Sequence, residues 1–138
     1  MAIKTYDPKQ VAIYIGPVAI SGWVSASVSF EDDSYEHTSG VDGEEMRTKK
    51  NDNRATLTLS LNQSSDSNDY LSGLHAADRL TNAGVLPVII KDNSGRSLVE
   101  SESGWIKKAA DFRREASPQP VEWMLSLSNA IIFHGGHD

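Results

Sequence analysis

Residues 31–53 form a long polar segment between two segments that alternate apolar and polar residues. Connections longer than about 12 to 15 residues are uncommon in compact domains unless they are functional or disordered. Tyr35, Val41 and Met46 are the only sizeable apolar side chains in this segment, too few to form a core of their own. We therefore expect residues 31–53 to be an interaction loop that becomes ordered against a partner.

Both flanking segments have the two-residue period of a strand with one buried face. In residues 23–31, the apolar positions are Val24, Ala26, Val28 and Phe30, and serines occupy the positions between them. In residues 54–62, the apolar positions are Leu57, Leu59 and Leu61, and the polar ones are Thr56, Thr58, Ser60 and Asn62. We expect the leucines in the core and the polar set on a wall that faces water or a partner.

The remaining pattern predicts one helix among further strands. Polar residues that favour helix starts precede Ser67, apolar residues then recur every three or four positions, and Asn82 to Gly84 supply a left-handed stop. Strands are expected at 11–15, 18–20, 86–91, 97–107, 121–127 and 131–133, separated by turn residues such as Asp92 to Gly95. The expected fold is mainly β, an antiparallel sandwich or barrel of about seven strands with one flanking α-helix.

Length and composition limit the functions open to this chain. Its 138 residues and 15.1 kDa predict a single domain, residues 1–138. We expect no cleaved signal and no membrane anchor, because no apolar run is long enough for either. The absence of cysteine excludes disulfides and thiolate nucleophiles. A net charge of -6 disfavours a surface that clings to DNA phosphates.

No residues predict a catalytic, cofactor or metal site. His134 and His137 are separated by two glycines at the end of the chain, where a solvated terminus is the better interpretation. The acidic residues 42, 44 and 45 lack the alternating spacing of a calcium loop. No Gly-x-Ser-x-Gly elbow is present, and His37 lies in the long loop, which disfavours a hydrolase.

Several short segments, in order, resemble the tail tube (inner tube) proteins of contractile-tailed bacteriophages. The similarity lies in the order of its parts, since no single part is diagnostic. The parts are Thr5 to Val11, Ile20 to Trp23, Gly40 to Glu44, Asn53-Arg54 with its alternating strand, and Gln63 to Leu71. The resemblance implies a β-barrel-like subunit that forms six-membered rings, which stack into a tube inside the contractile sheath.

The resemblance also implies partners and a location. The chain would bind itself, the sheath, the tape-measure protein and baseplate or terminator proteins, and it would lie in the virion tail after assembly in the host cytoplasm. DNA would pass through without specific binding. The polar residues Thr56, Thr58, Ser60 and Asn62 would then be lumen candidates. No cofactor is implied.

The charges of the long loop suggest contacts between identical subunits. Acidic residues lie at the start of the loop and at its centre, and basic residues lie after the centre. One copy's basic end could therefore meet the next copy's acidic end. The candidate inter-subunit residues are Asp32, Asp33, Asp42, Gly43, Glu44, Glu45, Arg47, Lys49 and Lys50.

Three alternatives remain open. Tube proteins of phage-like bacteriocins and of type VI secretion share the same pattern. A monomeric β-sandwich module that binds a ligand such as a carbohydrate would explain Trp23, Trp105 and Trp123, although large aromatics in strands more often lie in cores or interfaces. Such a module would leave residues 31–53 without a role.

Overall fold

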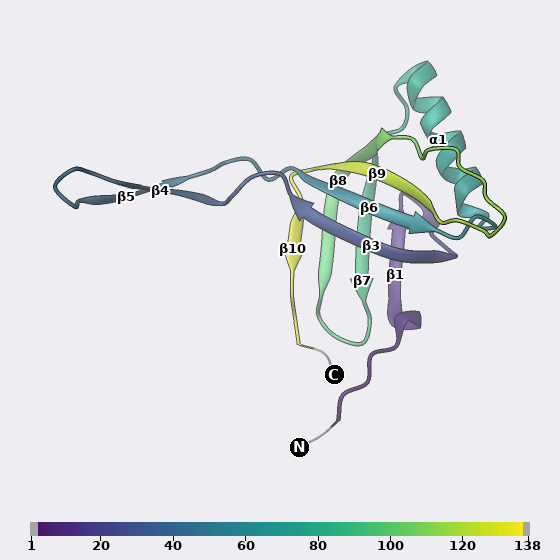
Figure 1. Cartoon of the computed structure of the whole chain (residues 1–138), viewed down its shortest axis with the longest axis horizontal. Helices are drawn as coiled ribbons and strands as arrows, with labels where there is room; N and C mark the ends of the chain where they lie inside the picture. The colour runs from purple at the N-terminus through teal and green to yellow at the C-terminus, as the bar shows by residue number, and fades with distance from the viewer. Residues whose placement is uncertain (1–2, 137–138) are drawn as a thin grey trace.

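A computed structural model describes residues 3–136, which form a bent antiparallel sheet, one helix and a projecting hairpin (Figure 1). The eight-stranded sheet has the order β2-β1-β7-β8-β9-β6-β3, with β10 paired to β8. Its strands are β1 Val11–Ile15, β2 Val18–Ala19, β3 Trp23–Phe30, β6 Ala55–Leu61, β7 Leu86–Asp92, β8 Leu98–Lys108, β9 Val121–Ser128 and β10 Ile131–Phe133. The hairpin contains β4 Tyr35–Ser39 and β5 Glu45–Lys49, and a short 3-10 helix, η1, spans Pro8–Gln10.

The sheet folds over on itself into two layers. Figure 1 shows β1, β7 and β10 crossing the direction of β3, β6 and β9. The long strand β8 belongs to both layers: Leu98 to Glu100 pair with β10, and Ser103 to Lys108 pair with β9. This arrangement confirms a mainly β fold with one helix, and it encloses the core between the two layers.

The alternation in residues 54–62 correctly predicted which side chains form the core. Leu57, Leu59 and Leu61 on β6 are completely buried. Their neighbours in the core come from both layers and include Ile13, Ile15, Val88, Leu125 and Leu127. Burying one such side chain contributes about 1.5 to 3 kcal/mol, so these residues dominate the stability of the domain.

The helix α1, Ser67–Thr81, begins and ends where the sequence indicates. Asn82 adopts the left-handed conformation with a φ of 60°, and its N–H bonds to the carbonyl oxygen of Asp78. Only the first half of α1 packs on the sheet: Leu71 is fully buried, whereas Leu80 is 85% exposed. The apolar spacing therefore predicted the helix but overstated the length of its buried face.

Three expectations require correction. The described residues contain ten strands rather than about seven. They form no closed barrel, because the sheet ends at β2 on one side and β3 on the other. In β3, the pairing shifts between Trp23 and Ser25, so Trp23 packs against the core while Val24 is 54% exposed. A bulge of this kind moves neighbouring side chains to the opposite face, which a strict two-residue period cannot anticipate.

Within residues 3–136, no helix is long and apolar enough to cross a membrane.

Candidate functional site

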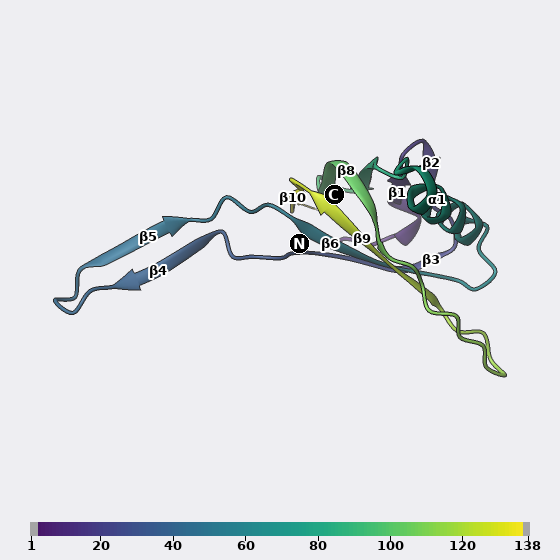
Figure 2. The same ribbon diagram turned by 90° about the horizontal axis from the view of Figure 1, so that it is seen from above.

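The segment predicted as a loop is a β-hairpin that projects from one end of the molecule (Figure 2). Its strands β4 and β5 pair antiparallel, with Tyr35 opposite Lys49 and Ser39 opposite Glu45. Every residue of both strands is exposed. The structure gives this expected loop paired strands, because backbone pairing needs no apolar side chains, and its ordering against a partner stays a prediction.

Glycine allows the tight turn at the hairpin tip. Gly43 has a φ of 85°, and its N–H bonds to the carbonyl oxygen of Gly40 over 3.0 Å. The backbone N–H of Glu44 donates to the Asp42 carboxylate over 3.1 Å. Val41 is fully exposed at this turn. The tip thus presents carboxylates around one apolar side chain.

Antiparallel pairing gives the hairpin a cationic face, which we define as Tyr35, His37, Arg47 and Lys49. Directly opposite residues project to the same side of a two-stranded ribbon, and Tyr35 pairs with Lys49 while His37 pairs with Arg47. The Arg47 guanidinium lies 4.2 Å from the centre of the Tyr35 ring. Glu45 lies closer to the tip, 3.4 Å from His37.

Part of the charge pattern assigned to contacts between subunits is satisfied within one chain. The Lys50 ammonium lies 3.5 Å from Glu36 and 3.8 Å from Asp32. At the hairpin base, Arg54 binds Asp52 through both Nε and Nη2, with the shorter contact at 2.6 Å. The side-chain hydrogen bonds from Arg54 hold the pKa of Asp52 at about 2, below its ordinary value of 3.8. These contacts set the junction between the hairpin and the sheet.

The predicted polar wall extends across neighbouring strands. Ser27 on β3 pairs with Thr58, and Ser29 pairs with Thr56. On the other side of β6, Thr56 pairs with Ser126 and Ser60 with Glu122. The Ser and Thr positions therefore form rows across β3 and β6, and on β9 these rows continue with Ser126, Met124 and Glu122. We call this surface the polar face.

Three of the four wall candidates are less accessible than expected. Thr58 and Ser60 are half-buried, and Asn62 is exposed just beyond the strand. Thr56 is only 9% exposed and is a correction to the expected wall. Its hydroxyl donates a hydrogen bond to the Glu31 carboxylate, which covers it.

The layer that carries the polar face has unpaired strand edges. Among residues 3–136, β3 pairs only with β6. The last residues of β8, 105–108, pair with β9, and no strand of the described part of the chain pairs with them on their other side. Exposed edges offer N–H and C=O groups to another chain. Trp105, 36% exposed, lies on this second edge.

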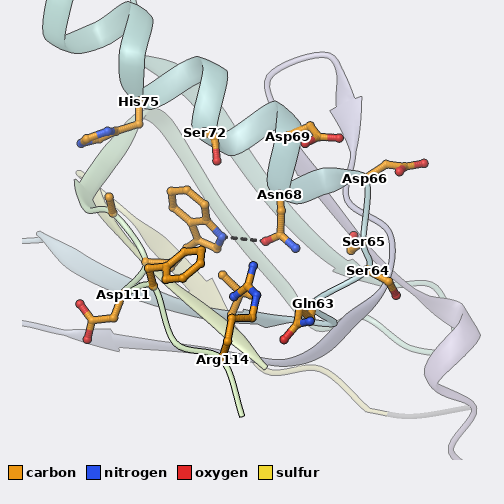
Figure 3. A pocket seen from close by; sticks show the side chains of 15 residues that line it. Gln63, Ser64, Ser65, Asp66, Asn68, Asp69, Ser72, His75, Asp111 and Arg114 are labelled. Atoms are coloured by element: carbon orange, nitrogen blue, oxygen red, sulfur yellow. Dashed lines mark hydrogen bonds between the residues drawn. The ribbon is translucent and has the colours of Figure 1, made fainter. Parts of the chain in front are cut away.

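A groove lies beside α1 (Figure 3), and α1 is at the end of the molecule away from the hairpin (Figure 1). We call it the α1 groove: it has a volume of about 500 Å³, between the first turns of α1 and residues 109–114. Trp123 forms part of its floor and donates its indole N–H to Asn68 over 3.0 Å. Phe112, 86% exposed, is another lining residue. No sequence pattern predicts this groove, since only the fold brings residues 63–75 beside residues 109–114.

The sequence predicts no metal site at His134 and His137, and His137 lies outside the described residues. In residues 3–136, no cluster of three or more His, Asp or Glu side chains is arranged to hold a metal ion.

Comparison with known proteins identifies the family. The family described as "Bacteriophage PhiTE tail tube protein" matches residues 18–133. This chain belongs to that phage tail tube family. It is 33% identical over 146 residues to structural protein ORF10 of Pseudomonas phage KPP10, covering 97% of this chain and 84% of that protein. Membership of the tail tube family confirms the resemblance and makes the chain a structural phage tail protein, not an enzyme.

Solved structures of contractile systems share the fold of this tail tube family chain. The tube-terminating cap of the anti-feeding prophage superposes with a TM-score of 0.65 at 12% identity, covering 96% of this chain and 94% of the cap. The sheath/tube terminator of an extracellular contractile injection system, PVC, gives 0.63 at 10% identity, covering 97% and 100%. At such identities, the likeness concerns the fold alone.

Proposed function

We propose that this chain forms the inner tail tube of a contractile phage tail, as stacked rings of six copies that conduct DNA and the tape-measure protein. The observation that carries this proposal is the polar face on a layer with two unpaired edges. Pairing of one copy's β3 with the 105–108 edge of the next would extend the layer from subunit to subunit. Such head-to-tail contacts make a ring when the rotation closes.

In this ring the polar face lines the lumen. Thr58, Ser60 and Asn62 would contact water and passing DNA. Thr56 would lie below this surface, covered by Glu31. Hydroxyl side chains without clustered Lys and Arg do not retain phosphates, which suits a conduit. A net charge of -6 per chain adds repulsion between the wall and the DNA.

The hairpin would connect successive rings, and its length is a reason to expect contacts beyond one subunit. The proposed inter-subunit residues are Asp32, Asp33, Asp42, Gly43, Glu44, Glu45, Arg47, Lys49 and Lys50. Lys50 is already paired with Glu36 and Asp32, so we expect Arg47 and Lys49 to carry most of the attraction. The sheath would surround the tube, and baseplate and terminator proteins would bind its ends.

A second function, that of a tube terminator, is favoured by the two structural neighbours. Both are described as caps or terminators, and each aligns with nearly the whole chain. A terminator also forms a ring, but it must block further stacking on one side. The matching family and the curated relative are both from phages, which favours a phage tail over a bacteriocin or secretion tube.

Electron microscopy of the purified protein over a range of concentrations separates these functions. A tube protein gives rings that stack into tubes of variable length. A terminator gives single rings that do not lengthen at higher concentration. A protein that stays monomeric at every concentration and salt condition, and also when tape-measure and baseplate proteins are added, would contradict both.

A further inference from the structure

The hairpin and the α1 groove lie at opposite ends of the same strands. β6 and β9 are antiparallel, with Ala55 opposite Leu127 and Leu61 opposite Val121. The hairpin leads into the Ala55 end, whereas α1 and residues 109–120 adjoin the Leu61 end. Figure 2 shows the hairpin extending from one end and the loop between β8 and β9 from the other. Copies stacked along this direction would bring one hairpin to the next copy's groove.

The charges of the groove and of the hairpin are complementary. Three acidic residues line the groove: Asp66 immediately before α1, Asp69 in its first turn and Asp111 in the facing loop. Arg114 is its only lining Arg or Lys within the part of the chain that the structure describes. The cationic face of the hairpin carries Arg47 and Lys49, and Glu45 lies on the same side nearer the tip, against His37.

The groove also offers an apolar floor and polar groups suited to a ribbon of backbone. Phe112 and Trp123 line the groove, as do Ser64, Ser65 and Ser72, which Figure 3 labels at the α1 end. The side-chain oxygen of Gln63, which also lines the groove, is buried without a hydrogen-bond partner in residues 3–136. A buried acceptor without a donor is costly and is relieved when a donor arrives.

We infer that the α1 groove receives the β4–β5 hairpin of a second copy of this chain, with its cationic face against Asp66, Asp69 and Asp111. This inference rests on the proposed stacking of identical rings and names the surface that the hairpin binds. It replaces contact between the basic and acidic ends of two hairpins with contact between the hairpin and the groove. The hairpin would then lose its solvent exposure on one face only.

Cysteine cross-linking tests the contact directly, since the natural chain contains no cysteine. One preparation carries His37→Cys on the cationic face, and another carries Ser72→Cys in the groove. The two are mixed, assembled and oxidised. We expect a disulfide-linked dimer of one copy of each. The matched control pairs His37→Cys with Ser27→Cys on the polar face, which should give no dimer.

Charge exchange gives an independent measurement. Both Arg47→Glu/Lys49→Glu and Asp69→Lys/Asp111→Lys should raise the critical concentration for tube formation several-fold. A protein that carries all four substitutions should have a critical concentration closer to that of the wild type. A lysine in the first turn of α1 opposes the helix dipole. Far-UV circular dichroism must therefore show a folded protein, and Asp69→Asn/Asp111→Asn provides a milder pair.

The outcomes separate this inference from the proposed function. Tubes that form normally without the His37–Ser72 cross-link, and whose groove charges can be reversed without effect, would overturn the groove contact while leaving the tube function intact. A different outcome is that the variant Arg47→Glu/Lys49→Glu regains tube formation when Asp42→Lys/Glu44→Lys is added. That result would show contact between hairpins and would overturn the inference. A wild-type protein that never forms rings or tubes would overturn both.

Discussion

The indole N–H of Trp123 on β9 donates a hydrogen bond to the side-chain oxygen of Asn68 in α1, over 3.0 Å. Trp123 is 4% exposed, so its polar atom depends on this one acceptor. Asn68 in turn donates to the carbonyl oxygen of Asn62, at the end of β6. This pair fixes the first turn of α1 against the layer that carries the polar face.

Asn68→Ala should lower the free energy of unfolding by about 1 to 3 kcal/mol, because it leaves the buried indole N–H without an acceptor. Chemical denaturation of the single variants Asn68→Ala and Trp123→Phe, and of the double variant, measures the coupling. Strictly additive losses would show that the hydrogen bond contributes nothing to stability.

Leu59→Ala should cost about 2 to 5 kcal/mol, because it opens a cavity at a fully buried position. Thr58→Ala, one residue away on the polar face, should cost about 0.5 kcal/mol or less. Denaturation midpoints give the order. The reverse order would mean that the strand register is shifted by one residue.

The base of the hairpin should loosen in acid. The pKa of Asp52 in the folded protein, about 2, lies below its ordinary value of 3.8. A lowered carboxylate pKa stabilises the fold above the ordinary value, and this contribution is lost as the pH falls from 3.8 through 2. The Asp52 carboxyl carbon shift, followed by NMR, should titrate near pH 2. In Arg54→Ala the midpoint should move towards the ordinary value; an unchanged midpoint would exclude Arg54 as the cause.

The hairpin amides should exchange rapidly with solvent in the monomer. All residues of β4 and β5 are exposed, and an isolated two-stranded hairpin is marginally stable in water. Hydrogen exchange followed by mass spectrometry should find the segment 35–49 unprotected in monomers and protected in tubes, with β6 protected in both. Equal protection of the hairpin before and after assembly would argue against a role in stacking.

Local patterns in the sequence predicted much of the fold. The alternation around Leu59 placed its side chain in the core, and the polar residues before Ser67 together with Asn82 located both ends of α1. These predictions succeed because side-chain period and capping are properties of neighbouring residues. The ordered motifs also pointed to the tail tube family.

Other features depended on which distant residues meet. The hairpin pairing of Tyr35 with Lys49 arises from backbone hydrogen bonds. The spacing of apolar residues does not report on such bonds. The bulge at Val24 and the cover that Glu31 places over Thr56 depend on contacts between separate strands.

The sequence by itself determined the strand and helix periods, the core leucines and the lack of cysteine. Only the tertiary structure decided that the sheet bends into two layers without closing, that within residues 3–136 the layer with the polar face has unpaired edges at β3 and at 105–108, and that residues 63–75 and 109–114 form a groove opposite the hairpin. The physical reason is that sheet pairing and grooves join residues far apart in the chain, whereas a pattern in the sequence reports only on near neighbours.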